Sequence, residues 1–227
     1  MTKTERIKHY LTQNNNQVLT QLIQHQRTQH AVANEFDVTT SLVKHVILQI
    51  EPDFDLKYHD YMFEQLVETL YYLQRGITLD VLIAFDVYRP TTNSTDLNIL
   101  MKRFKSQLRH YGIVTKLDRY ELMTPYALKV MVSNVYIERL LNKDLINQQI
   151  VDQYHISGAK VTKVKRFIQM FGHPMPFVSK RSYAAVKEHL VYYEQYLKGN
   201  VQPEDLYEQL IIATMTKYIK KDGFEDA

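Results

Sequence analysis

The chain has 227 residues, of which 45% are hydrophobic and 23% are charged, and its few glycines and prolines are typical of an ordered, helix-rich globular protein. It contains no cysteine, which excludes disulfides and thiolate metal sites. No apolar run approaches the roughly 18–20 residues that span a bilayer, and the N-terminal stretch MTKTERIKHY lacks the apolar core of a secretory signal. We therefore expect a soluble, cytoplasmic protein with no membrane partner.

The positive charges gather in stretches that contain no acid. The formal net charge is only +3, but no Asp or Glu occurs between Asp96 and Asp118 or between Asp152 and Glu188. Residues 51–68, in contrast, hold six acids against one lysine. Such separation indicates an anionic partner on one face, with a solvated charged surface as the simpler alternative.

In the first half of the chain, apolar residues recur at the spacing of α-helices. This spacing predicts helices over 17–27, 29–36, 40–50, 58–76 and 79–88. The long fourth helix is expected to end at Gly76, because glycine favours the left-handed conformation of a C-cap. The Pro-, Ser- and Thr-rich sequence YRPTTNST then predicts a turn.

The second half is also predicted to be helical, apart from one hairpin. A helix over 95–111 has Ser94 or Thr95 as its cap, with Asp96 near the positive end of its dipole. The alternating sequence IVTKLDRYELM, residues 113–123, predicts two short strands joined by a turn. Further helices are expected over 125–141, 148–154, 157–167, 182–199 and 202–221. The expected fold class is therefore mainly α with a small β-hairpin.

Residues 29–46 match the apolar pattern of a helix-turn-helix. Counted from Gln29, that motif requires apolar residues at positions 4, 8, 10, 15 and 18, a small residue at position 5, and a residue tolerant of positive φ at position 9. The sequence supplies Val32, Ala33, Phe36, Asp37, Val38, Val43 and Val46. Asp37 suits the turn because Asp tolerates the left-handed region, and Thr39 and Thr40 are candidate N-caps. Over these residues the chain resembles the helix-turn-helix DNA-binding proteins, which are mainly transcriptional regulators.

A second match begins at Asn147. It supplies Ile150, Val151, Tyr154, His155, Ile156, Val161 and Val164 at the same positions. Val151 is larger than the preferred alanine, so we expect a wider helix crossing in this copy. A shift of 118 positions, which takes Leu19 onto Ile137, aligns the apolar residues of the two copies. We interpret this as repeated architecture.

The two copies differ in the residues expected on the outside. The second presents side chains that can bond phosphates or base edges, namely Ser157, Lys160, Thr162, Lys163 and Arg166. The first presents Thr39, Thr40, Ser41, Lys44 and His45. It is also expected to expose Leu42 and Leu48, which suggests a surface covered by protein. The main DNA contact is therefore assigned to the second copy.

The middle of the chain resembles a winged helix. Its expected recognition helix, over 95–111, presents Asn98, Lys102, Lys105 and Arg109, and the hairpin after it would form the wing with Lys116. An ordinary amphipathic helix followed by a hairpin is the simpler alternative.

Patterns for catalysis, metals or cofactors are lacking. The nine histidines form no HExxH or His-x-His pattern, and neither GxGxxG nor a P-loop occurs. No nucleophile and base can be paired, so we expect no enzyme, no metal and no cofactor. The tyrosine groups Tyr71-Tyr72 and Tyr192-Tyr193-Tyr196 are interpreted as core, with a dimer interface as the alternative.

Together these patterns predict tandem helix-turn-helix and winged-helix units joined by long helices. The expected segments are a first helix-turn-helix unit over 1–57, a linking helix and winged-helix-like unit over 58–124, a second helix-turn-helix unit over 125–181, and C-terminal helices over 182–227. This architecture resembles, loosely, the Mga-like regulators of low-GC Gram-positive bacteria. The resemblance implies a homodimeric, sequence-specific double-stranded DNA-binding transcriptional regulator, and it allows a regulatory protein partner.

Two alternatives remain open at this point. Plasmid or phage replication initiators also use tandem winged helices, and an origin-like repeated site would distinguish them. A protein-interaction module built on helix-turn-helix units is the other, and the expected exposure of Leu42 and Leu48 favours it slightly.

Overall fold

The computed structural model describes residues 1–90, 96–114, 122–175 and 179–219. In these ranges the chain is mainly helical, which confirms the predicted fold class at that level. It forms two compact units. The first contains residues 1–67, 89–94 and 102–115, and the second contains residues 68–88, 95–101 and 116–227. Helices α4 (Phe54–Leu73) and α6 (Leu97–His110) each contribute residues to both units.

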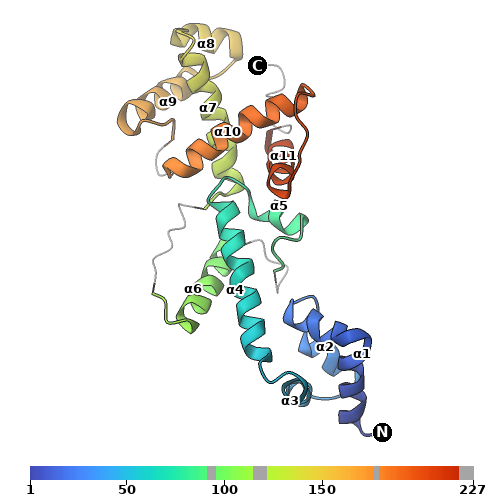
Figure 1. Ribbon diagram of the computed structural model, residues 1–227. Coiled ribbons are helices and arrows are strands. Elements are labelled where there is room, and N and C mark those ends of the chain that lie inside the picture. Colours follow the sequence, from blue (N-terminus) through green and yellow to red (C-terminus); the bar gives the residue numbers. More distant parts are fainter. Residues whose placement is uncertain (91–95, 115–121, 176–178, 220–227) are drawn as a thin grey trace. The chain divides into compact units, whose positions relative to one another are not determined.

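The first unit is built on three helices, α1 (Lys3–Ile23), α2 (Gln29–Glu35) and α3 (Thr40–Ile50) (Figure 1). The last two have the predicted bounds within a residue. The first begins well before the predicted residue 17, and residues 13–16 interrupt it with non-helical backbone angles. Asn14, Asn15 and Asn16 have positive φ, which asparagine tolerates better than most residues. Because these polar residues break the apolar periodicity, the helical turns before them were not predicted from the sequence.

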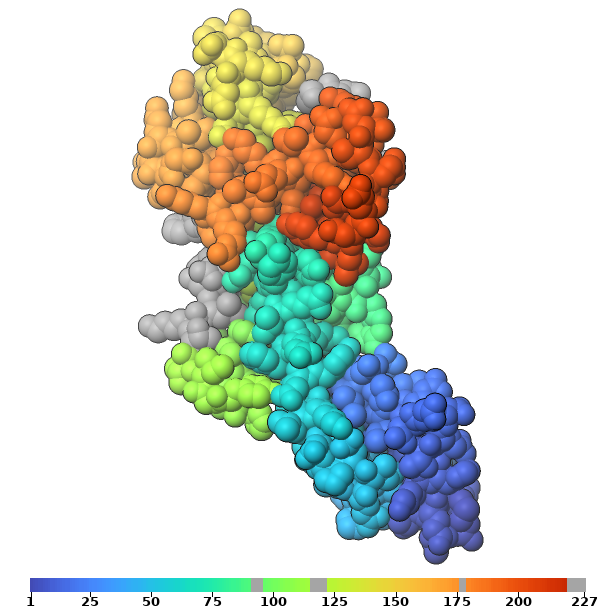
Figure 2. Space-filling view, viewed as in Figure 1, coloured from blue at the N-terminus to red at the C-terminus, as the bar shows by residue number. Residues whose placement is uncertain are grey.

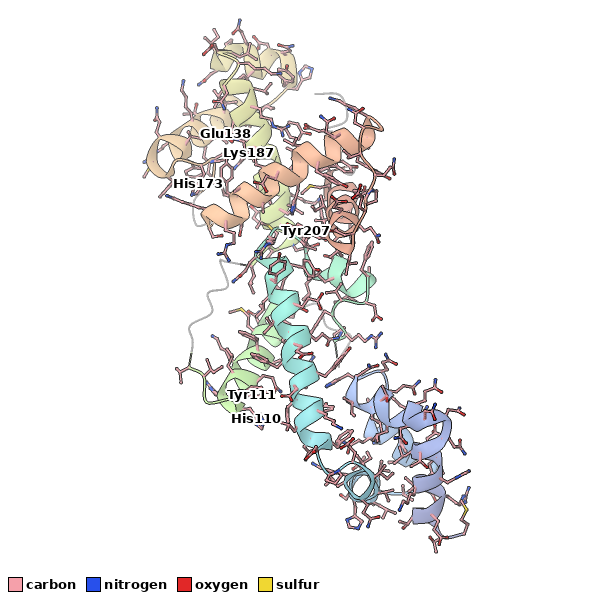
Figure 3. All side chains as sticks on the ribbon, in the orientation of Figure 1. His110, Tyr111, Glu138, His173, Lys187 and Tyr207 are labelled. Atoms are coloured by element: carbon pink, nitrogen blue, oxygen red, sulfur yellow. The ribbon has the colours of Figure 1, made fainter. Side chains whose placement is uncertain are left out.

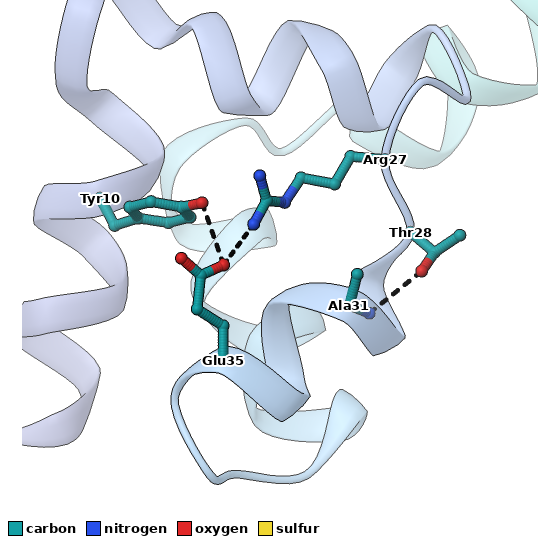
Figure 4. Close-up of polar contacts among 5 residues, drawn as sticks. All are labelled: Tyr10, Arg27, Thr28, Ala31 and Glu35. Carbon is teal, nitrogen blue, oxygen red and sulfur yellow. Dashed lines mark hydrogen bonds and ion pairs between the residues drawn. The ribbon is translucent and has the colours of Figure 1, made fainter.

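Polar contacts fasten α2 beside α1 (Figure 4). The Tyr10 hydroxyl donates a hydrogen bond of 3.1 Å to the Glu35 carboxylate, which also forms an ion pair with Arg27. The Thr28 hydroxyl caps α2 by accepting a hydrogen bond of 3.0 Å from the Ala31 N–H. Because the cap satisfies one of the otherwise unpaired N–H groups at the helix start, it helps to define where this short helix begins.

Within the first unit, the end of α6 packs against the start of α4. The Phe63 ring lies 6.3 Å from the Phe104 ring and 5.0 Å from the Tyr111 ring, centroid to centroid. Gln107 is buried and lies 3.2 Å from the Nδ1 atom of His59. Figure 3 labels His110 and Tyr111 at this end of α6. This packing selects the apolar side of α6 as its inner face.

The second unit surrounds helix α7 (Pro125–Leu141) (Figure 1). The helices that pack in this unit are α5 (Leu79–Ala84), α8 (Asn147–Tyr154), α9 (Gly158–Phe171), α10 (Lys180–Leu197) and α11 (Leu206–Ile219). Helix α7 contacts α8, α9, α10 and α11, so side chains all round it are buried. Thr124 caps it and Pro125 occupies its first turn, where the missing N–H is no loss.

Gly76 allows α10 to approach the end of α4 within the second unit. Its φ is +90°, and a Cβ atom placed there would lie 2.9 Å from a methyl group of Val186. Glycine is therefore required by both backbone conformation and close packing. The predicted helix end near Gly76 is confirmed, since α4 ends at Leu73.

The predicted wing is not supported by the described part of the chain, in which no strand is found. Of its residues, 115–121 lie outside the described ranges, and Ile113, Val114, Leu122 and Met123 are not in strands. The predicted caps Ser94 and Thr95 also lie outside those ranges. No helix in the described ranges is long and apolar enough to cross a membrane.

Candidate nucleic-acid interface

Both predicted helix-turn-helix turns form with the expected backbone. Asp37 has φ of 50° and His155 has φ of 51°, so position 9 is left-handed in each copy. The hydroxyls of Thr39 and Ser157 then cap the second helices. They accept hydrogen bonds from the backbone N–H groups of Leu42 and Lys160, with a nitrogen–oxygen distance of 3.3 Å in each case. Thr39 is thus the cap, and Thr40 is the first residue of α3.

The two motifs bury equivalent residues. In the first copy the aligned core residues are Leu19, Leu22, Val32, Val43 and Val46. In the second, at a shift of 118 positions, they are Ile137, Leu140, Ile150, Val161 and Val164. The repeated apolar pattern is therefore a repeated core, made by α1, α2 and α3 in one unit and by α7, α8 and α9 in the other.

The first copy has a larger core than the second. Five additional residues are buried in it. Besides Ala33, whose counterpart Val151 is partly buried, these are Ile7, Leu11, Ile47 and Phe54. The aligned counterparts of these last four are Pro125, Lys129, Lys165 and Gly172. Because no aligned apolar group covers the corresponding side of α9, that side is exposed, and Lys165 stands where Ile47 is fully buried.

Helix α9 presents an exposed cationic surface, which we call the α9 face and define as Thr162, Lys163, Lys165 and Arg166. None of its three cations forms an ion pair within the described ranges. The Lys163 ammonium lies 5.6 Å from the centroid of the Phe167 ring. Figure 2 shows the α9 segment, in light orange, at the molecular surface. Such side chains can reach phosphates or base edges without first breaking an ion pair.

Two residues expected in this surface have structural contacts instead. The Lys160 ammonium donates a hydrogen bond to the Ser133 hydroxyl on α7, so Lys160 helps to hold α9 on α7. Ser157 is exposed, but its hydroxyl caps α9. Lys165, conversely, was not singled out from the sequence. The acid-free stretch around it was the available signal.

The outer face of the first copy differs in charge. The Lys44 ammonium lies 3.1 Å from the Asp55 carboxylate, and Lys3 and Lys57 also have carboxylate partners, Asp37 and Glu51. Thr40 and Ser41 are exposed, and the His45 ring lies 3.0 Å from the Gln49 amide nitrogen. The cations of this copy are thus largely neutralised by neighbouring acids.

The expectation that Leu42 and Leu48 are exposed is wrong. Both are partly buried and pack against the core of the first copy. The reason is the extended core, which covers more of α3 than a minimal helix-turn-helix would. These leucines therefore no longer favour a protein-interaction module.

The central helix α6 offers a weaker set of basic residues. Asn98, Lys102 and Arg109 are exposed, and Lys105 is partly exposed. The Asn98 backbone N–H donates a hydrogen bond of 2.8 Å to the Asp96 carboxylate, which is the role expected of an acid at a helix start. Lys116 lies outside the described residues.

Other kinds of site find no support in the described ranges. No group of three or more His, Asp or Glu side chains there is arranged to hold a metal ion. Comparisons of the chain with protein-family models, curated proteins and solved structures found no match.

Proposed function

We propose that the protein binds double-stranded DNA through the α9 face and acts as a sequence-specific transcriptional regulator. The observation that carries the proposal is the set of exposed cations on the second helix of a helix-turn-helix, with no carboxylate partner in the described ranges. In such motifs the second helix lies in the major groove and its side chains contact base edges.

The side chains of the α9 face can make both kinds of DNA contact, those to base edges and those to phosphates. Lys163 and Arg166 can donate to guanine O6 and N7 atoms or to phosphates, and Thr162 can contact either. Lys165 adds a phosphate contact that supplies affinity without sequence information. Because phosphate contacts release counterions, binding through this surface would weaken steeply as salt rises.

A homodimer would place two α9 helices on half-sites about one helical turn apart. Lys102, Lys105 and Arg109 of α6 would supply a second set of contacts.

The test is a salt titration of DNA binding by the double variant Lys163→Ala/Arg166→Ala. DNA fragments selected from a genomic library supply the ligand. We expect affinity to fall at least tenfold and the slope of log K against log salt to decrease by roughly one to two. The matched control is Lys44→Ala/His45→Ala in the first copy, where Lys44 is already paired with Asp55. Unchanged affinity and slope in the α9 variant would contradict the proposal.

A further inference from the structure

A groove of about 510 Å³ lies between α10 and α11, entirely within the second unit. This volume is in the range of sites for drug-sized molecules. Apolar side chains form part of its lining, namely Val191, Val201 and Ile211. Val191 is 48% exposed, so its side chain is accessible to a ligand. The groove can therefore remove apolar ligand surface from water.

Two tyrosines and a neutral histidine add an aromatic component. Tyr192 and Tyr207 line the groove, and the Tyr207 hydroxyl lies 2.8 Å from the Nε2 atom of His189. Burial lowers the pKa of His189 to about 4, so its ring is neutral near pH 7. Aromatic faces carry partial negative charge and attract cations. These side chains therefore favour a cationic ligand over an anionic one.

Carboxylates give the groove a negative potential. Glu188 and Glu208 line it. Burial, followed by a hydrogen bond to the Glu208 carboxylate and then by the charges of Glu208, Asp205 and Glu204, raises the pKa of Tyr192 to about 12. The part of the shift that comes from these three carboxylates reflects negative charge near the Tyr192 hydroxyl, which disfavours its ionised form.

The lysine in the lining is paired with another acid. The Lys187 ammonium lies 3.5 Å from the Glu138 carboxylate of α7, which also accepts a hydrogen bond from Tyr183. Figure 3 labels Glu138, Lys187 and Tyr207. With Lys187 neutralised in this way, Glu188 and Glu208 leave the charge of the lining negative.

We infer that this groove binds a small organic cation with an apolar body, such as a lipophilic ammonium or phosphonium compound. The apolar residues would cover its body, and Tyr192, Tyr207, Glu188 and Glu208 would surround its charge. Its acidic character makes the groove unsuitable for nucleic acid, so this site is separate from the α9 face and does not depend on DNA binding.

The test is calorimetric titration of the full chain with tetraphenylphosphonium, and with tetraphenylborate as a matched anion of the same shape. We expect saturable binding of the cation at one site and much weaker binding of the anion. Equal binding of the two ions would show that the groove is merely apolar and would overturn the inference, as would failure of the cation to bind.

A variant pair locates the site. Glu188→Gln/Glu208→Gln removes two charges from the groove and retains side-chain shape. We expect it to weaken tetraphenylphosphonium binding by roughly two- to thirtyfold, which corresponds to two partly exposed charge contacts. Asp53→Asn/Glu64→Gln removes two exposed charges from the first unit and should leave binding unchanged. If the groove variant kept its helical circular dichroism and bound tetraphenylphosphonium as tightly as the unmodified protein does, the assignment of the cation to this groove would be contradicted. DNA titration of the same variant should be unaffected.

Discussion

The two helix-turn-helix copies share a set of core positions but differ in the burial and charge of the positions around them. Val43 and Val161 occupy equivalent positions, and both are fully buried. One turn further along the second helix, Ile47 is fully buried whereas its counterpart Lys165 is exposed. The motif thus determines a small set of inward positions, and each copy uses the remaining positions differently. The first copy uses them to extend its core, and the second leaves them as the cationic α9 face.

Exchanging residues between the copies is the strongest test of this difference. Ile47→Lys should lower the free energy of unfolding by about 3–5 kcal/mol, because a charge would be buried without a partner. The reciprocal change Lys165→Ile should alter stability by less than about 0.5 kcal/mol, as is usual for an exposed position. Urea unfolding measures both. Similar costs for the two changes would show that the surfaces do not differ as described. Lys165→Ile should also reduce the salt slope of DNA binding by roughly one.

Acidification should distinguish the two compact units. Burial lowers the pKa of His189 in the second unit to about 4, from a usual value of 6.5. The unfolded chain therefore binds a proton below pH 6.5 that the folded chain does not, and stability should fall between pH 6.5 and 4. At pH 5 the loss is expected to be about 2 kcal/mol.

The measurement is urea unfolding at pH 7 and pH 5, monitored by the near-ultraviolet circular dichroism of the tyrosine side chains. His189→Gln is the control, and it should reduce the pH dependence. Burial also lowers the pKa of His25 in the first unit, where this ring stacks on Tyr58. His25→Gln should therefore leave the larger part of the pH dependence in place. If His25→Gln removed more of it than His189→Gln, the contrast between the units would be wrong.

The smallest expected effect concerns the left-handed turn residue that the two copies share, Asp37 in the first and His155 in the second. Asp37→Gly and His155→Gly should each raise the free energy of unfolding by a few tenths of a kcal/mol, up to about 1 kcal/mol, because both positions have positive φ. Thermal unfolding of the two variants provides the comparison. A loss of stability in either would mean that the native side chain contributes more than its backbone strain costs.

Much of the motif could be predicted because its requirements are local. The apolar spacing within about 20 residues identified Val32, Val43 and their counterparts, and the tolerance of Asp for positive φ identified the turn at Asp37. Features that depend on distant segments were missed. Leu42 and Leu48 were expected to be exposed, because nothing near them in sequence predicts the extended core of the first copy. Lys160 was expected to face DNA. Its hydrogen-bond partner Ser133 lies on a different helix, so nothing near Lys160 in sequence indicates that contact.

The sequence by itself determined the helical class, the two repeated cores and the acid-free charge of the second motif, since periodicity and composition act over short distances. Only the tertiary structure decided which outward positions are covered. It neutralised Lys44 with Asp55, turned Lys160 toward α7, and left Lys163, Lys165 and Arg166 exposed. It also brought α10 and α11 together around an acidic, aromatic groove. The physical reason is that exposure and ion pairing depend on what packs against a helix, and those neighbours come from segments far apart in the chain.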